Sequence, residues 1–220
     1  MKKLIALLLF TASFAMGCAF HHDEVVGSGQ RVRQKREVAA FTSIRTEGAY
    51  QIEVVSQQAL SLEIEADDNI MPIITTNVNS GILRITTTKG FSSKTPIIVK
   101  IGTPNLEAIS AAGAGTIEVS SLKNEKFEID SSGAPTIKVS GETGTLDIKA
   151  NGAGKVDAHK LRAARSTVVA NGVARIEVFA REELNVTVSG PATVIYGGDP
   201  KVNKTVHGPG SVERRASEGA

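Results

Sequence analysis

Acidic residues recur at intervals that would bring them together in a stacked structure. Glu128 is followed 19 residues later by Asp147, and Asp157 is followed 20 residues later by Glu177. In stacked strands, equivalent positions lie about 4.8 Å apart. Paired carboxylates can bind Ca²⁺ or serve as acid and base in glycoside cleavage. We expect solvent to screen both pairs, with an acidic Ca²⁺ site as the alternative. Catalysis is disfavoured because no His or Arg lies in register to complete a catalytic site.

The histidines do not complete a site either. We expect His159 to lie in a turn and His207 beside a glycine corner, neither with a metal-ligand partner at usable spacing. Asp67-Asp68-Asn69 is similar to part of a Ca²⁺ loop but lacks the following Gly and the distal Glu, so we interpret it as a turn. The sequence contains no Ser-nucleophile motif, phosphate loop or zinc pattern. It therefore predicts no enzyme, no metal and no cofactor.

A second set of residues suits binding rather than catalysis. These residues are small and polar, and each precedes a recurring glycine: Ser132, Asn151, Asn171 and Ser189. We take them as a candidate ligand face, because many sugar-contacting surfaces are small and polar. A second candidate face is an outer column of strand residues: Ser110, Asp130, Lys149, Val169, Thr187 and Thr205. Long flat faces of this kind suit a glycan, a peptide strand or a partner protein.

The glycines themselves mark a repeat of 18–20 residues from about residue 106 onward. They are Gly113, Gly133, Gly152, Gly172, Gly190 and Gly208. Four residues after each stands a β-branched aliphatic residue: Ile117, Ile137, Val156, Ile176, Val194 and Val212. Apolar and polar residues alternate on both sides of each glycine, which indicates strand, corner, strand. The repeat predicts an all-β fold, a single-stranded right-handed parallel β-helix or β-solenoid with 18–20-residue rungs.

The solenoid domain is expected to span residues 37–213, with a less regular half at 37–105 and regular repeats at 106–213. We expect no helix in the mature chain except one turn near Asp67–Met71. Lys204 and Arg214 replace core residues in the final unit, as a polar cap would. Residues 214–220 are expected to form a disordered tail.

The N-terminus is typical of a bacterial lipoprotein signal. A basic Lys2-Lys3 pair precedes an apolar segment too short to span a bilayer, so residues 1–17 are interpreted as a signal peptide. Cys18 follows Gly17, as the lipidated cysteine of a lipobox does, although Ala15 stands where Leu is usual. Lipidation at Cys18 would anchor the protein to the membrane. Ordinary secretion with an unpaired Cys is the alternative.

Residues 18–36 would then form a flexible tether after the lipid anchor. They include a short basic run, Arg31, Arg33, Lys35 and Arg36, which we interpret as solvated, with contact to anionic headgroups as the alternative. Ala19, rather than Asp, follows the cysteine, which suggests the outer membrane.

Composition limits the classes of partner. The 220 residues carry a net charge of +2 and no basic stripe with interleaved aromatics, which argues against nucleic acid. The single cysteine leaves no intramolecular disulfide. The expected partners are the membrane, through the lipid, and a glycan or an envelope protein. The oligomeric state is not predicted.

Several motifs together resemble the GIN-domain family. They are Phe41-x-x-Ile44, Glu47-Gly48-Ala49-Tyr50, Ala66-Asp67-Asp68-Asn69-Ile70 and the Gly-Ala-Gly repeats. The resemblance covers residues 38–213. The family is described as a domain of unknown function and as an auto-transporter adhesin head domain. The resemblance implies a β-helical fold in the cell envelope, commonly as a lipoprotein, and offers no catalytic residues to transfer.

Three functions remain open from the sequence. The favoured one is a non-enzymatic envelope lipoprotein whose adhesin-like solenoid binds an extended ligand. The second is a carbohydrate-active enzyme with a site near Glu128, Asp130 and Asp147, against which the short and uniform turns count. The third is a purely structural envelope component.

Overall fold

The computed structural model describes residues 24–216. The predicted signal peptide (1–17), Cys18 and the end of the predicted tail (217–220) lie outside the described residues. Among residues 24–216, no helix is long and apolar enough to cross a membrane.

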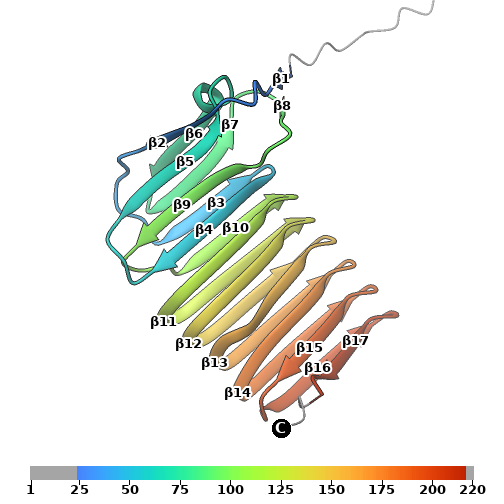
Figure 1. Cartoon of the computed structure of the whole chain (residues 1–220). Coiled ribbons are helices and arrows are strands. Elements are labelled where there is room, and N and C mark those ends of the chain that lie inside the picture. The colour runs from blue at the N-terminus through green and yellow to red at the C-terminus, as the bar shows by residue number, and fades with distance from the viewer. Residues whose placement is uncertain (1–23, 217–220) are drawn as a thin grey trace, which may run out of the picture.

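Four long strands build the regular half of the molecule (Figure 1). They are β11 (Thr116–Gly133), β12 (Thr136–Ala150), β13 (Lys155–Asn171) and β14 (Arg175–Ser189). Each runs along one wall, bends, and returns along the other wall to the next glycine corner. Neighbouring strands pair in parallel, with Ile117 beside Ile137 and Ile129 beside Ile148. The predicted all-β solenoid is therefore confirmed, and its register is the one that the glycine repeat gives.

Two parallel walls enclose the core. The wall that precedes each corner, the pre-glycine sheet, contains β3 (Ser43–Glu47), β10 (Ala108–Gly113), the C-terminal halves of β11 to β14, and β16 (Lys201–His207). The wall that follows each corner, the post-glycine sheet, contains β9 (Ile97–Thr103), β4 (Tyr50–Ser56), the N-terminal halves of β11 to β14, β15 (Thr193–Gly197) and β17 (Ser211–Arg214).

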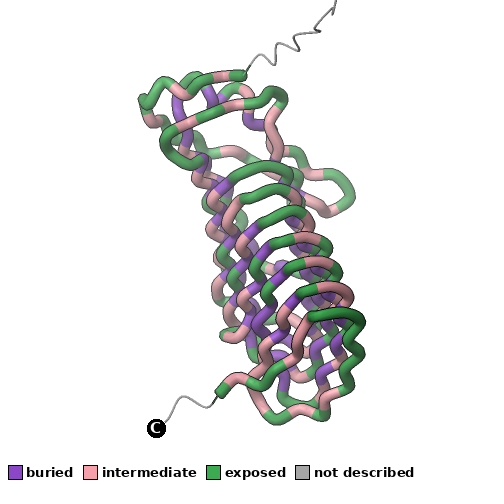
Figure 2. Tube along the Cα trace, turned by 90° about the vertical axis from the view of Figure 1, so that its right-hand side faces the viewer, coloured by how far each residue is buried: buried purple, intermediate pink, exposed green. Residues whose placement is uncertain are grey.

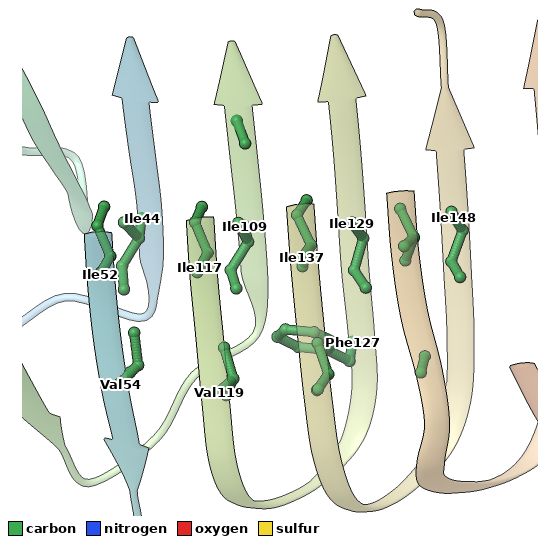
Figure 3. Close-up of a cluster of buried hydrophobic side chains, with 14 of the residues drawn as sticks. Ile44, Ile52, Val54, Ile109, Ile117, Val119, Phe127, Ile129, Ile137 and Ile148 are labelled. Carbon is green, nitrogen blue, oxygen red and sulfur yellow. The ribbon is translucent and has the colours of Figure 1, made fainter. Parts of the chain in front are cut away.

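The core lies between these walls, where side chains from both sheets meet (Figure 3). Ile109, Ile129 and Ile148 of one wall face Ile117 and Ile137 of the other. Along each strand, buried and exposed residues alternate (Figure 2), because successive side chains point to opposite faces. Burying such side chains stabilises the fold by about 1.5–3 kcal/mol each.

Glycine is required at the corners because successive rungs approach closely there. At Gly113, φ is +124°, and a Cβ would lie 2.4 Å from the Gly48 carbonyl oxygen. At Gly152, φ is outside the left-handed region, but a Cβ would lie 2.1 Å from the Gly133 carbonyl oxygen. Close backbone stacking accounts for glycine at Gly152, and a positive φ adds a second requirement at the other five corners.

Antiparallel strands close the N-terminal end. On the pre-glycine wall, β7 (Ile82–Thr87) pairs with β3, and β6 (Ile74–Asn79) pairs antiparallel with β7. On the other wall, β5 (Ser61–Asp67) pairs antiparallel with β9, and β2 (Arg31–Lys35) pairs antiparallel with β5. The expected helical turn is present as a turn at 68–70 followed by η1 (Met71–Ile73).

The prediction of a flexible tether through residue 36 is wrong for its second half. The short strand β1 (Val25–Val26) pairs with β8 (Phe91–Ser92), and β2 is an edge strand of the domain. Two arginines of the basic run are paired: Arg31 Nη1 lies 3.3 Å from Asp67 Oδ1, and Arg33 Nε lies 2.8 Å from Glu65 Oε2. Arg33 and Lys35 are exposed to solvent, as predicted.

Arg36 extends the same attachment. Its Nη1 donates to the Ile74 carbonyl at 2.8 Å and to Thr76 Oγ1 at 3.1 Å. The domain therefore begins before residue 37, and the basic run holds the N-terminal segment against β5 and β6.

The prediction of a disordered tail from residue 214 is wrong for residues 214 and 215. Arg214 ends β17, and the backbone N–H of Arg215 donates to the Tyr196 carbonyl at 2.7 Å. The final strands β16 and β17 pair only inward, with β14 and β15 respectively, among the strands of the described chain.

Candidate functional site

The outer face of the pre-glycine sheet carries a shallow groove of about 460 Å³. It crosses β3, β10, β11, β12 and β13. The side chains there stand in rows set by the strand register, with Ser110 beside Asp130 and Asp130 beside Lys149. These residues alternate along their strands with the buried Ile129 and Ile148, which orients them outward. The outer column proposed from the sequence thus lies partly within this groove.

The first acidic pair is close in space and is bridged by one lysine. Glu128 and Asp147 are register partners, and Lys126 stands two residues before Glu128 on the same face of β11. Lys126 Nζ contacts the Glu128 carboxylate and lies 3.4 Å from Asp147 Oδ2. The hydrogen bond from Lys126 holds the pKa of Glu128 below its usual range, and the Glu128 carboxylate raises the pKa of Lys126. A general acid for glycoside cleavage needs a raised pKa, so this carboxyl is poorly suited to that role.

Lys126 was missed by the sequence reasoning, which compared equivalent positions of neighbouring rungs. The sequence nevertheless indicates the contact between Lys126 and Glu128, because both residues lie on the single strand β11. Residues 126 and 128 are two positions apart, so their side chains share a face.

The second acidic pair lies on the outer face of the post-glycine sheet. Asp157 and Glu177 are register partners of β13 and β14. The prediction that His159 lies in a turn without a ligand partner is wrong. β13 continues through residue 159, so His159 shares a face with Asp157, and its Nδ1 contacts Asp157 Oδ1. One ligand atom from each of Asp157, His159 and Glu177 lies within 4.8 Å of the other two.

Positive side chains already surround this cluster. Arg175 Nε lies 3.2 Å and Lys155 Nζ lies 3.9 Å from Glu177 Oε1, and Arg215 contacts Glu177 Oε2. Glu177 is consequently only 8% exposed, although it points outward. Burial raises the pKa of Asp157, but hydrogen bonds from His159 outweigh it and lower the pKa overall. Three cations against two carboxylates disfavour a divalent metal ion at this position.

The small polar ladder stands at the ends of the pre-glycine strands. Asn171 Nδ2 donates to Asn151 Oδ1 at 3.0 Å, and both side chains are exposed. Asn171 is also the register partner of Ser189, and Ser132 Oγ is 3.4 Å from the Ala111 carbonyl. The two asparagines thus use part of their hydrogen-bonding capacity on each other. The ligand face at Ser132, Asn151, Asn171 and Ser189 stays a prediction.

Comparison with known structures identifies the same fold in three bacterial proteins. A crystal structure of a "putative adhesin" from Bacteroides fragilis is 20% identical with a TM-score of 0.70, over 87% of this chain and all of that one. Another from Parabacteroides distasonis is 22% identical with a TM-score of 0.58, over 88% of this chain and all of that one. A "putative lipid binding protein" from Parabacteroides distasonis is 17% identical with a TM-score of 0.54, over the same shares. At these identities the likeness shows the fold alone.

Sequence comparison places the chain in a family. Comparison with curated proteins finds no match. A protein family described as "Putative auto-transporter adhesin, head GIN domain" matches residues 40–200, which is most of the chain and covers both the antiparallel end and the regular rungs. The resemblance drawn from the motifs at residues 41–50 and 66–70 is thereby confirmed. The chain belongs to this head GIN domain family.

Proposed function

We propose that this protein is a non-enzymatic, adhesin-like module of the cell envelope that binds an extended glycan along the pre-glycine sheet. The observation that carries the proposal is the groove across five strands, in which outward polar side chains stand in register. The strand spacing of about 4.8 Å is close to the length of one sugar unit in an extended chain. A glycan lying along the solenoid axis would therefore meet equivalent rows in succession.

The composition of the groove supports a polyhydroxylated ligand. Ser110 and Thr167 offer hydroxyls, Asp130 accepts hydrogen bonds and Lys149 donates them. Small residues such as Ala108 leave room for a sugar ring to approach the sheet. The low pKa of Glu128, beside Lys126, favours binding over hydrolysis at this place.

The envelope location is part of the same proposal. An adhesin family description fits a cell-surface or envelope protein. The lipobox-like sequence at Cys18 supports a lipid anchor, and Ala19 after it supports the outer membrane. Metabolic labelling with an alkyne fatty acid tests the anchor. We expect label on the wild-type chain and none on Cys18→Ser, and label retained by Cys18→Ser would contradict it.

A glycan array probed with the Cys18→Ser chain tests the binding function. The best glycan is then titrated against Lys149→Ala in the groove and Lys138→Ala, which lies on the same strand β12 but on the opposite wall. We expect Lys149→Ala to weaken binding by about tenfold, as for a lost charge-assisted hydrogen bond, and Lys138→Ala to leave it unchanged.

Equal effects of the two lysine variants would contradict the choice of groove. In that case Asn151→Ala with Asn171→Ala tests the small polar ladder, where loss of binding would move the glycan to the strand ends. An array without any bound glycan would refute the glycan, and a protein partner or a structural envelope role would then be the better account.

A further inference from the structure

A second depression lies near the C-terminal end, on the other side of the solenoid from the groove. It has a volume of about 790 Å³ and is lined by residues of β13, β14, β15 and β17 and by residues that follow β15 and β17. Among residues 24–216, its lining contains three arginines (Arg162, Arg214 and Arg215), His159 and no acidic residue. We call this depression the arginine cleft.

Two consecutive glycines keep the floor of the arginine cleft bare. A Cβ at Gly197 would lie 3.2 Å from the Phe179 ring. At Gly198, φ is +91°, and a Cβ would collide with the Ala180 carbonyl oxygen. The preceding rung carries Phe179 at the position that pairs with Gly197, so no side chain from the next strand covers this ring. The floor consequently consists of the Phe179 ring and bare glycine backbone.

The arginines surround this floor with hydrogen-bond donors. The Arg162 guanidinium stacks over Phe179, 4.1 Å from the ring centroid, which fixes its orientation by a cation–π contact. No carboxylate within residues 24–216 forms an ion pair with it. Arg162 therefore presents an unpaired planar fork at the cleft, the geometry that binds carboxylates in a bidentate manner.

The other two arginines are held in place and keep donors to spare. Arg214 Nη2 donates to the Gly198 carbonyl at 2.9 Å and to Asp199 at 3.1 Å, and Asp199 is almost fully exposed. Arg215 contacts Glu177. Each guanidinium has five N–H donors, so these contacts leave several free. The charge at the cleft is positive, which favours an anionic ligand.

We propose that the arginine cleft binds a carboxylate-bearing sugar, a uronic acid alone or within a glycan. The carboxylate pairs with Arg162, and the apolar face of the sugar ring lies toward Phe179 and the glycine floor. This site is separate from the groove of the pre-glycine sheet and does not depend on the function proposed there. An acidic sugar contacts both the arginines and the floor formed by Phe179 and the glycines, whereas a simple anion contacts only the arginines.

Titration of the Cys18→Ser chain with D-glucuronate, followed by amide NMR shifts, tests the proposal, with glucose and acetate as comparison ligands. A ligand of this size is expected to bind with a dissociation constant of about 1 mM. We expect glucose and acetate each to bind at least tenfold more weakly. Acetate binding as tightly as glucuronate would overturn the sugar assignment, and no saturable shift with glucuronate would overturn the site.

Two variants separate charge from shape. Arg162→Gln should weaken glucuronate binding by about tenfold, the loss of one charge-assisted pair. Arg165→Gln is the matched control, because Arg165 lies three residues further along β13, is exposed, and pairs with Glu182. Gly197→Ala places a methyl group on the floor while every arginine remains, and should also abolish the saturable shift.

The outcomes of these variants are decisive in either direction. Equal affinity for Arg162→Gln and Arg165→Gln would refute the arginine contact. Unchanged binding by Gly197→Ala, in a chain whose circular dichroism and Tm match the wild type, would refute the sugar-ring contact. The groove variant Lys149→Ala should leave glucuronate binding at the cleft unaltered, which keeps this proposal distinct from the first.

Discussion

Substituting Gly152 with alanine tests the close stacking of the rungs. The Gly152→Ala Cβ would lie 2.1 Å from the Gly133 carbonyl oxygen, whereas ordinary contact begins at 3.4 Å, so the two corners must separate by about 1.3 Å. Two backbone hydrogen bonds hold these corners together: Ala153 N–H to the Gly133 carbonyl at 2.7 Å and Asn151 N–H to the Ser131 carbonyl at 2.8 Å.

The expected loss follows from these two effects. Overpacking of this kind costs about 1–3 kcal/mol, and each weakened hydrogen bond costs about 1 kcal/mol. We therefore expect the free energy of unfolding to fall by about 3–5 kcal/mol. For a chain of this length, that corresponds to a fall in Tm of about 6 °C or more.

Urea denaturation and thermal melts followed by circular dichroism measure the effect. Gly81→Ala is the matched control, because Gly81 has a φ of +75° but nothing within 4 Å of its Cβ position. Its free energy of unfolding should fall only by the cost of placing alanine in the left-handed conformation, about 1–2 kcal/mol. If Gly152→Ala destabilises the protein no more than Gly81→Ala does, close approach of the rungs is not the reason for glycine at the corners.

Three further changes have defined outcomes. Phe127→Ala removes a fully buried ring and should lower the free energy of unfolding by about 3–5 kcal/mol in urea denaturation, and a loss below 1 kcal/mol would contradict the packing. Burial raises the pKa of Asp67, but hydrogen bonds from Gly29, Ser93, Arg31 and Thr95 outweigh it and lower the pKa overall. The ionised carboxylate therefore stabilises the folded protein above the ordinary carboxyl pKa of 3.8, and this stabilisation is lost as the pH falls below that value. Urea midpoints measured from pH 7 to pH 3 should therefore fall less steeply for Asp67→Asn than for the wild type, and parallel curves would refute this. Lys126→Met should raise the pKa of Glu128, as followed by carboxyl NMR titration, and an unmoved pKa would show that Lys126 does not set it.

The regular half of the fold was predictable because its information is local. A column such as Ile117 and Ile137, four residues after successive glycines, specifies both the strand and its register. The rungs repeat, so one correct unit predicts the others. The N-terminal end was not predictable in the same way, because Arg31 meets Asp67 across 36 residues of sequence and an antiparallel pairing. A local pattern of four basic residues contains no sign of that partner.

The candidate sites were predictable only where they follow the repeat. Glu128 and Asp147 were placed together correctly, since both occupy the same position of neighbouring rungs. Departures from the repeat were missed. His159 lies beside Asp157 because β13 runs on through the bend, and Arg215 reaches back to Glu177 from the chain end. Such contacts depend on the local course of the backbone, which a column alignment cannot represent.

The two ends of the solenoid have unequal consequences for how the chain can evolve. The N-terminal end is finished by strands that interrupt the repeat, while the last rung, β16 and β17, is simply another turn with fewer apolar residues. Strand pairing joins each regular rung only to the rungs beside it, so duplication or deletion of one unit between β11 and β13 leaves the pairing at both ends as it is. The solenoid can therefore lengthen or shorten by whole rungs in evolution. Its N-terminal end, with the antiparallel strands, stays the same while the length of the molecule varies.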